Sequence, residues 1–123
     1  MITAENGAGQ WELQTMSPVT TNDFGEVVLD SSLPVFACFT TQPCESCFPL
    51  CLLARELAEE YRGRIKFVTI DAGEEAALAD RYHVLSVPTA ILFRGSRPAK
   101  RLLGFHCKSV LRNLLAEAIK GGA

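Results

Sequence analysis

A run of five apolar, β-prone residues, Val35 to Phe39, constrains the fold of this chain more than any other feature. A strand without alternating polar residues is typical of a sheet that is buried on both faces. Helices must then cover the sheet from both sides, because neither apolar face can be left in water. The chain has 123 residues, the size of one domain, so we expect these helices to share a single core with the sheet.

The rest of the chain alternates between helical and strand patterns. Apolar residues from Leu50 to Tyr61 recur at helical spacing with charged residues between them, and Gly63 is a natural C-terminal stop. Gly95 marks a hairpin turn between two strands. The remaining patterns predict short helices over 21–29 and 74–82, a C-terminal helix over 111–119, and strands over 65–70, 89–93 and 100–103.

The order of these elements predicts the fold class. Strands that alternate with helices pair in parallel through crossover connections, whereas the late hairpin adds an antiparallel strand. We therefore expect an α/β fold with a central mixed sheet of four to five strands and helices on both faces. Residues 1–18 are predicted to form an N-terminal extension that is either partly flexible or supplies an edge strand over 11–16, and residues 19–123 to form the domain.

Composition excludes several classes of function. Apolar residues make up 48% of the chain and charged residues 21%, which is typical of a soluble globular protein. The net charge of -2 provides no basic field for a phosphate backbone, so we expect no nucleic-acid partner. The longest apolar runs, over 33–39 and 48–54, fall far short of the roughly 18 residues that span a bilayer, so we expect no membrane insertion.

The five cysteines are an odd number, and their spacing does not match the disulfide framework of a small secreted domain. At least one thiol must be free or must pair with another molecule. Residues 1–10 lack the basic start and the apolar stretch of a secretory signal. We therefore expect a cytoplasmic protein.

The motif Cys44-Glu45-Ser46-Cys47 follows the first central strand and opens the long amphipathic helix. Cysteines three residues apart on a helix lie within reach of the roughly 5.5 to 6 Å Cα separation that a disulfide prefers. Unpaired N–H groups and the positive end of the helix dipole stabilise a thiolate at the first cysteine. We therefore predict that Cys44 is the attacking nucleophile and that Cys47 resolves the resulting mixed disulfide.

Three further features of the sequence belong together: the Cys-x-x-Cys motif follows an apolar strand, the segment Ser86-Val87-Pro88-Thr89 leads into another, and Gly104 follows the last hairpin strand. On these features the chain resembles the thioredoxin family over residues 19–120, and the segment over 86–89 is similar to the family's cis-proline loop. The resemblance implies that Val87 offers backbone hydrogen bonds to an extended substrate. It also implies that the Val87–Pro88 peptide bond is cis and that Pro88 keeps metal ions away from the thiols.

The resemblance further implies a function, a thiol–disulfide oxidoreductase that reduces protein disulfides and contributes to electron transport and cell redox homeostasis. Its redox group would be the Cys44–Cys47 disulfide, with no other cofactor. Electrons would come from a separate flavoprotein similar to thioredoxin reductase, because the chain has no nucleotide-binding glycine loop. We expect a monomer. By position in the family, the substrate surface would consist of Pro43, Ile70, Val87, Pro88, Gly104 and Phe105.

Two departures from the family surround the dithiol. The usual Trp before the first cysteine is Pro43, and the usual Gly-Pro between the cysteines is Glu45-Ser46. A carboxylate beside Cys44 opposes thiolate formation, whereas the Ser46 hydroxyl can donate a hydrogen bond to the thiolate. The redox potential of the family therefore does not transfer to this chain.

Other departures lie behind the dithiol and along its helix. Cys38 replaces the family's buried Asp, and Phe67 replaces the nearby Lys. A buried thiol is a poor base at neutral pH, so we expect Cys47 either to resolve mixed disulfides slowly or to lose its proton through water. Leu52 replaces the helix-kinking proline and Pro49 lies nearer the helix start, which either moves strain toward the dithiol or delays the regular helix.

Two other classes of function remain open. A metal or iron–sulfur site could use Cys44, Cys47 and Cys51 with His106 or Cys107 as a fourth ligand, although the second matched pair of a zinc site is absent from the sequence. Alternatively, the loss of the family's Trp, Asp and Lys could mark a redox-inert adaptor with the same fold.

The three cysteines outside the motif have simpler interpretations. Cys38 is predicted to pack in the core as a small apolar residue. Cys51 lies four residues after Cys47, where it either packs or serves as an alternative disulfide partner or metal ligand. Cys107 is predicted to be exposed near the start of the last helix, where a regulatory role is the alternative to a passive surface position.

Overall fold

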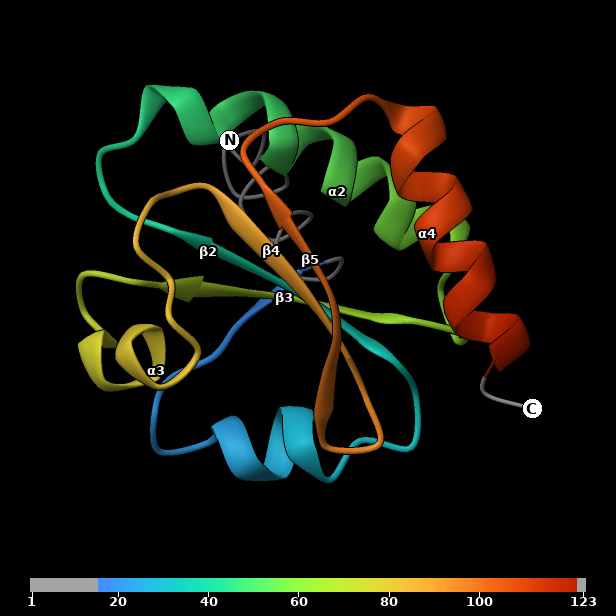
Figure 1. The fold of residues 1–123 in the computed structure, drawn as a ribbon, viewed down its shortest axis with the longest axis horizontal. Coiled ribbons are helices and arrows are strands. Elements are labelled where there is room, and N and C mark those ends of the chain that lie inside the picture. The colour runs from blue at the N-terminus through green and yellow to red at the C-terminus, as the bar shows by residue number, and fades with distance from the viewer. Residues whose placement is uncertain (1–15, 122–123) are drawn as a thin grey trace, which may run out of the picture.

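A computed structural model describes residues 16–121. Its strands form one five-stranded sheet in the order β1-β3-β2-β4-β5 (Figure 1). The strands are β1 (Ser17–Pro18), β2 (Val35–Thr40), β3 (Lys66–Asp71), β4 (Thr89–Arg94) and β5 (Arg97–Leu103). The helical elements are the π-helical turn η1 (Gly25–Leu29), the 3-10 turn η2 (Glu45–Cys47), α2 (Phe48–Glu60), α3 (Ala76–Arg81) and α4 (Lys108–Gly121).

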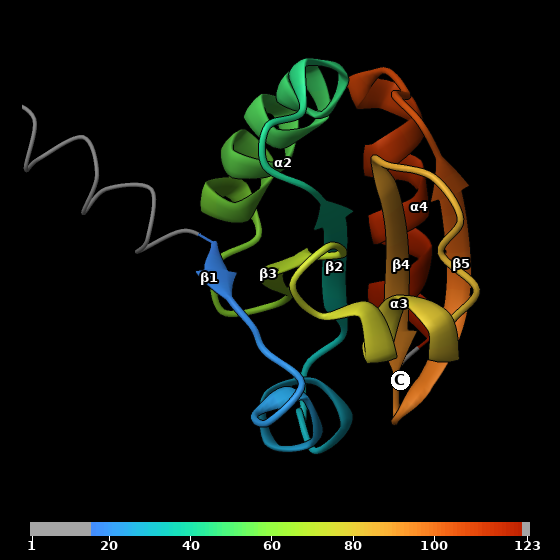
Figure 2. The ribbon, with the colours of Figure 1, turned by 90° about the vertical axis from the view of Figure 1, so that its left-hand side faces the viewer.

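The sheet is mixed, as the sequence predicts. β1 and β2 run parallel to β3, whereas β4 is antiparallel to both β2 and β5. Figure 2 shows β1 and β5 at the two edges of the sheet with β2 near its centre. The central position of β2 explains its uninterrupted apolar sequence, because it has a strand on each side and a helical layer on each face. The predicted α/β fold class is therefore confirmed.

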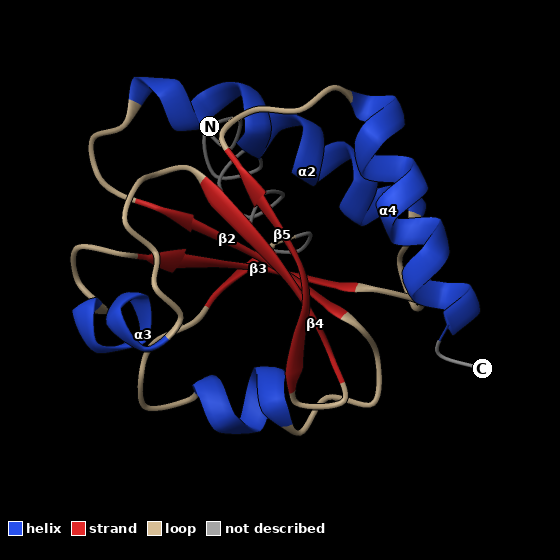
Figure 3. Cartoon of the chain, viewed as in Figure 1, coloured by secondary structure: helices blue, strands red, loops and turns tan. Residues whose placement is uncertain are grey.

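The two faces of the sheet are covered by different helices (Figure 3). Alternate residues of β2 point to opposite faces: Phe36 and Cys38 pack in one core cluster, and Val35, Ala37 and Phe39 pack in the other. The first cluster contains the buried residues of α2 and α4, and the second contains Val28 of η1 and Leu78 of α3.

Aromatic rings organise the second core cluster. Phe93 on β4 makes edge-on contacts with Phe24 and Tyr82, with ring centroids 5.6 Å and 5.1 Å apart. Phe24 and Phe93 are each only 1% exposed. These contacts hold the start of η1 and the end of α3 against the sheet.

The β4–β5 hairpin closes through a two-residue turn. Gly95 and Ser96 both have positive φ angles, 57° and 75°, which matches the twist of the adjoining strands. The Ser96 hydroxyl donates a hydrogen bond of 2.7 Å to the carbonyl of Leu29. The hairpin tip is thereby tied to the end of η1.

The N-terminal boundary is only partly described. The predicted edge strand over 11–16 lies, except for Met16, outside the described residues, and the parallel pairing of β1 with β3 begins at Ser17. The division at residue 18 stays a prediction. Within residues 16–121, no helix has the length and apolar character needed to cross a membrane.

Candidate active site

Three segments of the chain meet at one edge of the sheet, the edge at which β2 and β5 end and β4 begins. The register pairs Phe39, near the end of β2, with Thr89 at the start of β4, and pairs Thr89 in turn with the last residue of β5. The chain that leads from β2 to Cys44, the chain that enters β4 through Pro88, and the chain that leaves β5 through Gly104 therefore share this edge (Figure 1).

Cys44 and Cys47 are joined by a disulfide bond at this edge, with their Cα atoms 5.4 Å apart. The two residues differ in accessibility: Cys44 is half-buried, whereas Cys47 is only 3% exposed. Cys44 is therefore the more accessible of the two to a thiolate or a disulfide of another protein. This difference fits the predicted roles, in which Cys44 attacks and Cys47 resolves.

Cys44 lies at the N-terminus of a continuous helical segment. It precedes η2, and η2 runs directly into α2, so helical backbone extends over residues 45–60. Once the disulfide is reduced, the unpaired N–H groups and the helix dipole stabilise negative charge on the Cys44 sulfur. Ser46 supports this further, because its Oγ lies 3.5 Å from the Cys44 Sγ.

The regular helix begins after the motif. Pro49 occupies the first turn of α2, where its missing N–H leaves no hydrogen bond unmade. The three residues before Phe48 instead form the tighter 3-10 turn. Of the two alternatives that the sequence left open, the structure shows the delayed start of the regular helix.

The loop before β4 has the conformation that the resemblance implies, because the Val87–Pro88 peptide bond is cis. Two hydrogen bonds hold this loop: the Gly104 N–H donates to the Pro88 carbonyl at 2.8 Å, and the Thr89 hydroxyl donates to the Ser86 carbonyl at 2.7 Å. Gly104 has a φ of 74°, which favours glycine. The Gln42–Pro43 peptide bond is also cis, which the sequence analysis did not anticipate.

The structure separates the six residues of the predicted substrate surface into two groups. The prediction is wrong for Ile70, because Ile70 is fully buried in the core cluster beneath η1 and α3. Pro88 is also buried and can only support the surface from below. The other four are at least partly accessible: Pro43 and Phe105 are exposed, and Val87 and Gly104 are half-buried.

Sequence analysis missed Phe48, which directly follows Cys47 and is 61% exposed. Phe105 lies three residues before α4, and α4 is joined to α2 by ion pairs of Lys108 with Glu56 at 2.9 Å and of Arg112 with Glu60 at 2.7 Å.

The sequence does carry a signal for the exposure of Phe48, because Phe48 lies outside the apolar stripe of the helix that predicts burial. An aromatic residue outside this stripe next to a reactive cysteine indicates a contact surface. We refer to Pro43, Phe48, Val87 and Phe105 as the apolar rim of the disulfide.

Cys38 lies under the site on β2 and is fully buried, as predicted. Burial is the larger of two causes that raise the pKa of Cys38 far above its ordinary value, and the negative charge of a Cys51 thiolate is the smaller. Phe67, at the position of the family's Lys, packs against Phe36 with ring centroids 5.2 Å apart. The structure thus places neither a carboxylate nor an amine at these two positions.

The metal-site alternative gains no support from the described residues. Cys44 and Cys47 bond to each other, and residues 16–121 contain no group of three or more His, Cys, Asp or Glu side chains placed to hold a metal ion. His106 instead contacts the carbonyl of Leu103 at 3.1 Å.

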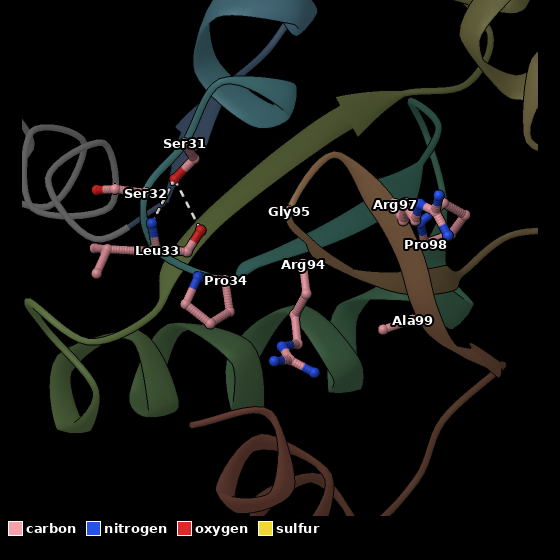
Figure 4. Close-up of a pocket in the computed structure, with 9 residues that line it drawn as sticks. All are labelled: Ser31, Ser32, Leu33, Pro34, Arg94, Gly95, Arg97, Pro98 and Ala99. Carbon is pink, nitrogen blue, oxygen red and sulfur yellow. Dashed lines mark hydrogen bonds between the residues drawn. The ribbon is translucent and has the colours of Figure 1, made fainter. Parts of the chain in front are cut away.

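A cavity of about 530 Å³ lies away from the disulfide (Figure 4). Its lining includes Pro34, Arg94 and Arg97. Because Val35 at the start of β2 pairs with Phe93 near the end of β4, this cavity lies at the opposite edge of the sheet from Cys44.

Cys107 is the exposed free thiol near the start of α4. Its Sγ lies 3.3 Å from the Ser109 Oγ, and this hydrogen bond, followed by one from the Val110 N–H, lowers the pKa of the Cys107 thiol. We expect the pH midpoint of its alkylation by iodoacetamide to lie below that of an unperturbed cysteine. Ser109→Ala should move the midpoint upward, and an unchanged midpoint would show that Ser109 does not stabilise the thiolate.

The fold and the disulfide define a class of protein, an α/β domain that carries a helix-start dithiol beside a cis-proline loop. Comparison with known proteins gives the same result. The sequence matches the thioredoxin family over residues 15–117. It is 30% identical over 103 residues to Thioredoxin 1 of Nostoc sp., covering 84% of this chain and 96% of that protein.

Two further relatives extend this comparison. The chain is 31% identical over 97 residues to a thioredoxin of Synechocystis sp., covering 79% of this chain and 91% of that one. It is 32% identical over 101 residues to a bifunctional thioredoxin reductase/thioredoxin of Mycobacterium leprae, covering 82% of this chain and 22% of that larger protein.

The chain therefore belongs to the thioredoxin family, and it is a thiol–disulfide oxidoreductase. The redox-inert adaptor and the metal-binding module find no support in these comparisons.

Proposed function

We propose that the protein reduces disulfide bonds of other proteins through a cycle between the Cys44–Cys47 dithiol and its disulfide. The observation that carries this proposal is the bond between an accessible sulfur at a helix start and a buried sulfur one turn further on. Because the electrons are held in the two thiols themselves, the cycle needs no bound cofactor.

Each turn of the cycle moves two electrons. The Cys44 thiolate attacks one sulfur of the substrate disulfide, and the other substrate sulfur leaves as a thiolate that takes a proton from water. Cys47 then loses its proton and attacks the Cys44 sulfur. The Cys44–Cys47 disulfide forms, the mixed disulfide breaks, and the second substrate sulfur leaves in reduced form.

Proton removal from Cys47 is the step in which this protein differs from the family pattern. Cys38 occupies the position of the usual acid–base Asp, and burial keeps it protonated. A protonated thiol cannot accept the Cys47 proton, so we propose that the proton leaves through water. The resolving step is therefore expected to be slower than the attack by Cys44.

A separate flavoprotein reductase would return the disulfide to the dithiol. Support comes from the bifunctional relative in Mycobacterium leprae, whose name joins a thioredoxin reductase and a thioredoxin in one chain. We propose that this protein acts as a monomer in the cytosol, where thiols are kept reduced. The free thiols of Cys38, Cys51 and Cys107 are compatible with that compartment.

The apolar rim is proposed to bind the substrate protein. Phe48→Ser and Phe105→Ser should each raise the KM for insulin by about tenfold, since an exposed aromatic contact is worth on the order of 1.4 kcal/mol. Steady-state kinetics with insulin measure this effect. The rate with hydroxyethyl disulfide, which is too small to cover the rim, should stay unchanged, and Arg97→Ser at the opposite edge should affect neither substrate. Equal losses with both disulfides would contradict the role of the rim.

Trapping the mixed disulfide tests the proposed order of attack. A Cys47→Ser variant should remain covalently bound to insulin through Cys44, because the thiol that resolves the intermediate has been removed. Non-reducing electrophoresis and peptide mapping detect this adduct. The matched Cys44→Ser variant should form none, and an adduct through Cys47 in that variant would contradict the assignment.

A further inference from the structure

Two thiols behind the active-site disulfide are not used in the cycle described above. Cys38 lies on β2 and is fully buried, and Cys51 lies on α2, four residues after Cys47, and is half-buried. Both are free. Cys38 occupies the position of an acid–base residue, but a buried, protonated thiol cannot act as a base. Cys38 therefore has no role in the cycle described above.

Cys51 and Cys38 lie on the same side of the sheet. Cys51 lines a cavity of about 350 Å³ together with Thr40 and Thr69. Thr40 lies two residues after Cys38 on the same strand, and Thr69 is the partner of Cys38 on β3, so both project from the same face of the sheet as Cys38. Since Cys51 lines one cavity with both threonines, it lies on the side of the sheet that Cys38 faces.

Packing of α2 supports the same placement. Leu50 and Ala54, which flank Cys51 on the helix, pack in the core cluster that contains Cys38. Negative charge on Cys51 also raises the pKa of Cys38, so the two thiols interact electrostatically. Cys47 and Cys51 at the start of the helical segment and Cys38 on β2 thus lie on the same side of the sheet.

We propose that Cys38 and Cys51 form a second dithiol that donates two electrons to the Cys44–Cys47 disulfide. This inference rests on the proposed function, because the substrate supplies the oxidising equivalents. A fully reduced chain could then reduce two substrate disulfides before it needs its reductase.

The transfer takes place in two exchange steps. Cys51 loses its proton to water in the cavity and attacks the Cys47 sulfur, so that the Cys47–Cys51 bond forms, the Cys44–Cys47 bond breaks and Cys44 leaves as a thiolate. Cys38 then attacks the Cys51 sulfur, so that the Cys38–Cys51 bond forms and the Cys47–Cys51 bond breaks, and the proton of Cys38 passes to the leaving Cys47 sulfur. The products are the Cys44 and Cys47 thiols and a Cys38–Cys51 disulfide.

The electrostatics of the two pairs favour this direction. Burial raises the pKa of both Cys38 and Cys51, so their reduced forms are not stabilised as thiolates. A pair whose reduced form is stabilised is the stronger oxidant, which here is the pair that contains the helix-start Cys44. The small thiolate fraction of the inner pair also predicts that its transfer is slower than the first reduction of substrate.

The test measures how many insulin disulfides one reduced chain can reduce. In a Cys107→Ala background, the protein is reduced, freed of reductant and mixed with excess insulin. Insulin is the substrate because it is too large to enter the cavity beside Cys51. The reaction is stopped with acid, free thiols are alkylated after denaturation, and pepsin digestion at acid pH separates the cysteines for mass spectrometry. We expect two insulin disulfides to be reduced per chain, the second more slowly, and a Cys38–Cys51 linked peptide to appear.

Matched variants isolate the second pair. Cys51→Ala and Cys38→Ala should each lower the yield to one insulin disulfide per chain and leave the Cys44–Cys47 linkage intact. Cys44→Ser should prevent the Cys38–Cys51 linkage, because transfer passes through the outer pair.

The outcomes separate the two proposals. A yield of one per chain with Cys38 and Cys51 both alkylated would overturn the second dithiol and leave the proposed function standing. A Cys38–Cys51 linkage in the Cys44→Ser variant would also overturn the relay. Failure to reduce insulin at all, with no Cys44–Cys47 linkage, would overturn the proposed function itself.

Discussion

Cys44→Ser should lower the rate of insulin reduction by at least about a hundredfold, because a serine hydroxyl is not ionised at neutral pH and cannot form the mixed disulfide. Cys44 is also the accessible sulfur of the pair, so no other residue of the motif can replace it. The rate is measured from precipitation of the reduced insulin B chain with dithiothreitol as the electron source.

Cys51→Ala is the matched control for this prediction, since it removes a cysteine from the same helix without touching the motif. Its first turnover should proceed at the rate of the unmodified protein. A Cys44→Ser variant that kept more than about a tenth of the activity would contradict nucleophilic attack by Cys44.

Phe93→Ala should lower the free energy of unfolding by about 3 to 5 kcal/mol, the range for deleting a buried aromatic side chain. Phe93 is 1% exposed and contacts the rings of Phe24 and Tyr82, so its removal opens a cavity between β4 and the helices on that face. Urea denaturation followed by far-ultraviolet circular dichroism measures the change. Such a loss is a large part of the roughly 5 to 15 kcal/mol that stabilises a typical domain.

Phe48→Ala provides the comparison, because Phe48 is 61% exposed. We expect its effect on stability to stay within about 0.5 kcal/mol. If Phe93→Ala cost less than about 1 kcal/mol, the aromatic cluster would not be the packed core that the ring contacts describe.

The strands and long helices could be predicted from local pattern alone. The run Val35 to Phe39 indicates a doubly buried strand, and the apolar stripe from Leu50 to Tyr61 indicates one covering helix. Both patterns report burial directly, because apolar spacing follows the periodicity of the element that is buried. The disulfide could also be predicted, since the spacing within the motif fixes the separation of Cys44 and Cys47.

Other features depend on tertiary contacts that no local pattern carries. Ile70 lies in a strand buried on both faces, so its sequence neighbourhood cannot show which side chains reach the surface. The exposure of Phe48 depends on which face of the helical segment packs on the sheet, and this packing joins residues far apart in the sequence. The placement of Cys51 on the side of the sheet that Cys38 faces likewise depends on how α2 packs on β2 and β3.

A redox titration of the Cys44–Cys47 pair tests the central claim most directly. The protein is equilibrated in dithiothreitol buffers of defined potential, quenched with acid and alkylated, and the Cys44–Cys47 linked peptide is quantified by mass spectrometry. If this protein reduces protein disulfides as proposed, we expect the pair to be half-oxidised near the roughly -270 mV of reducing thioredoxins. A midpoint near about -120 mV would indicate an oxidase, and failure of these two thiols to pair would contradict the dithiol mechanism.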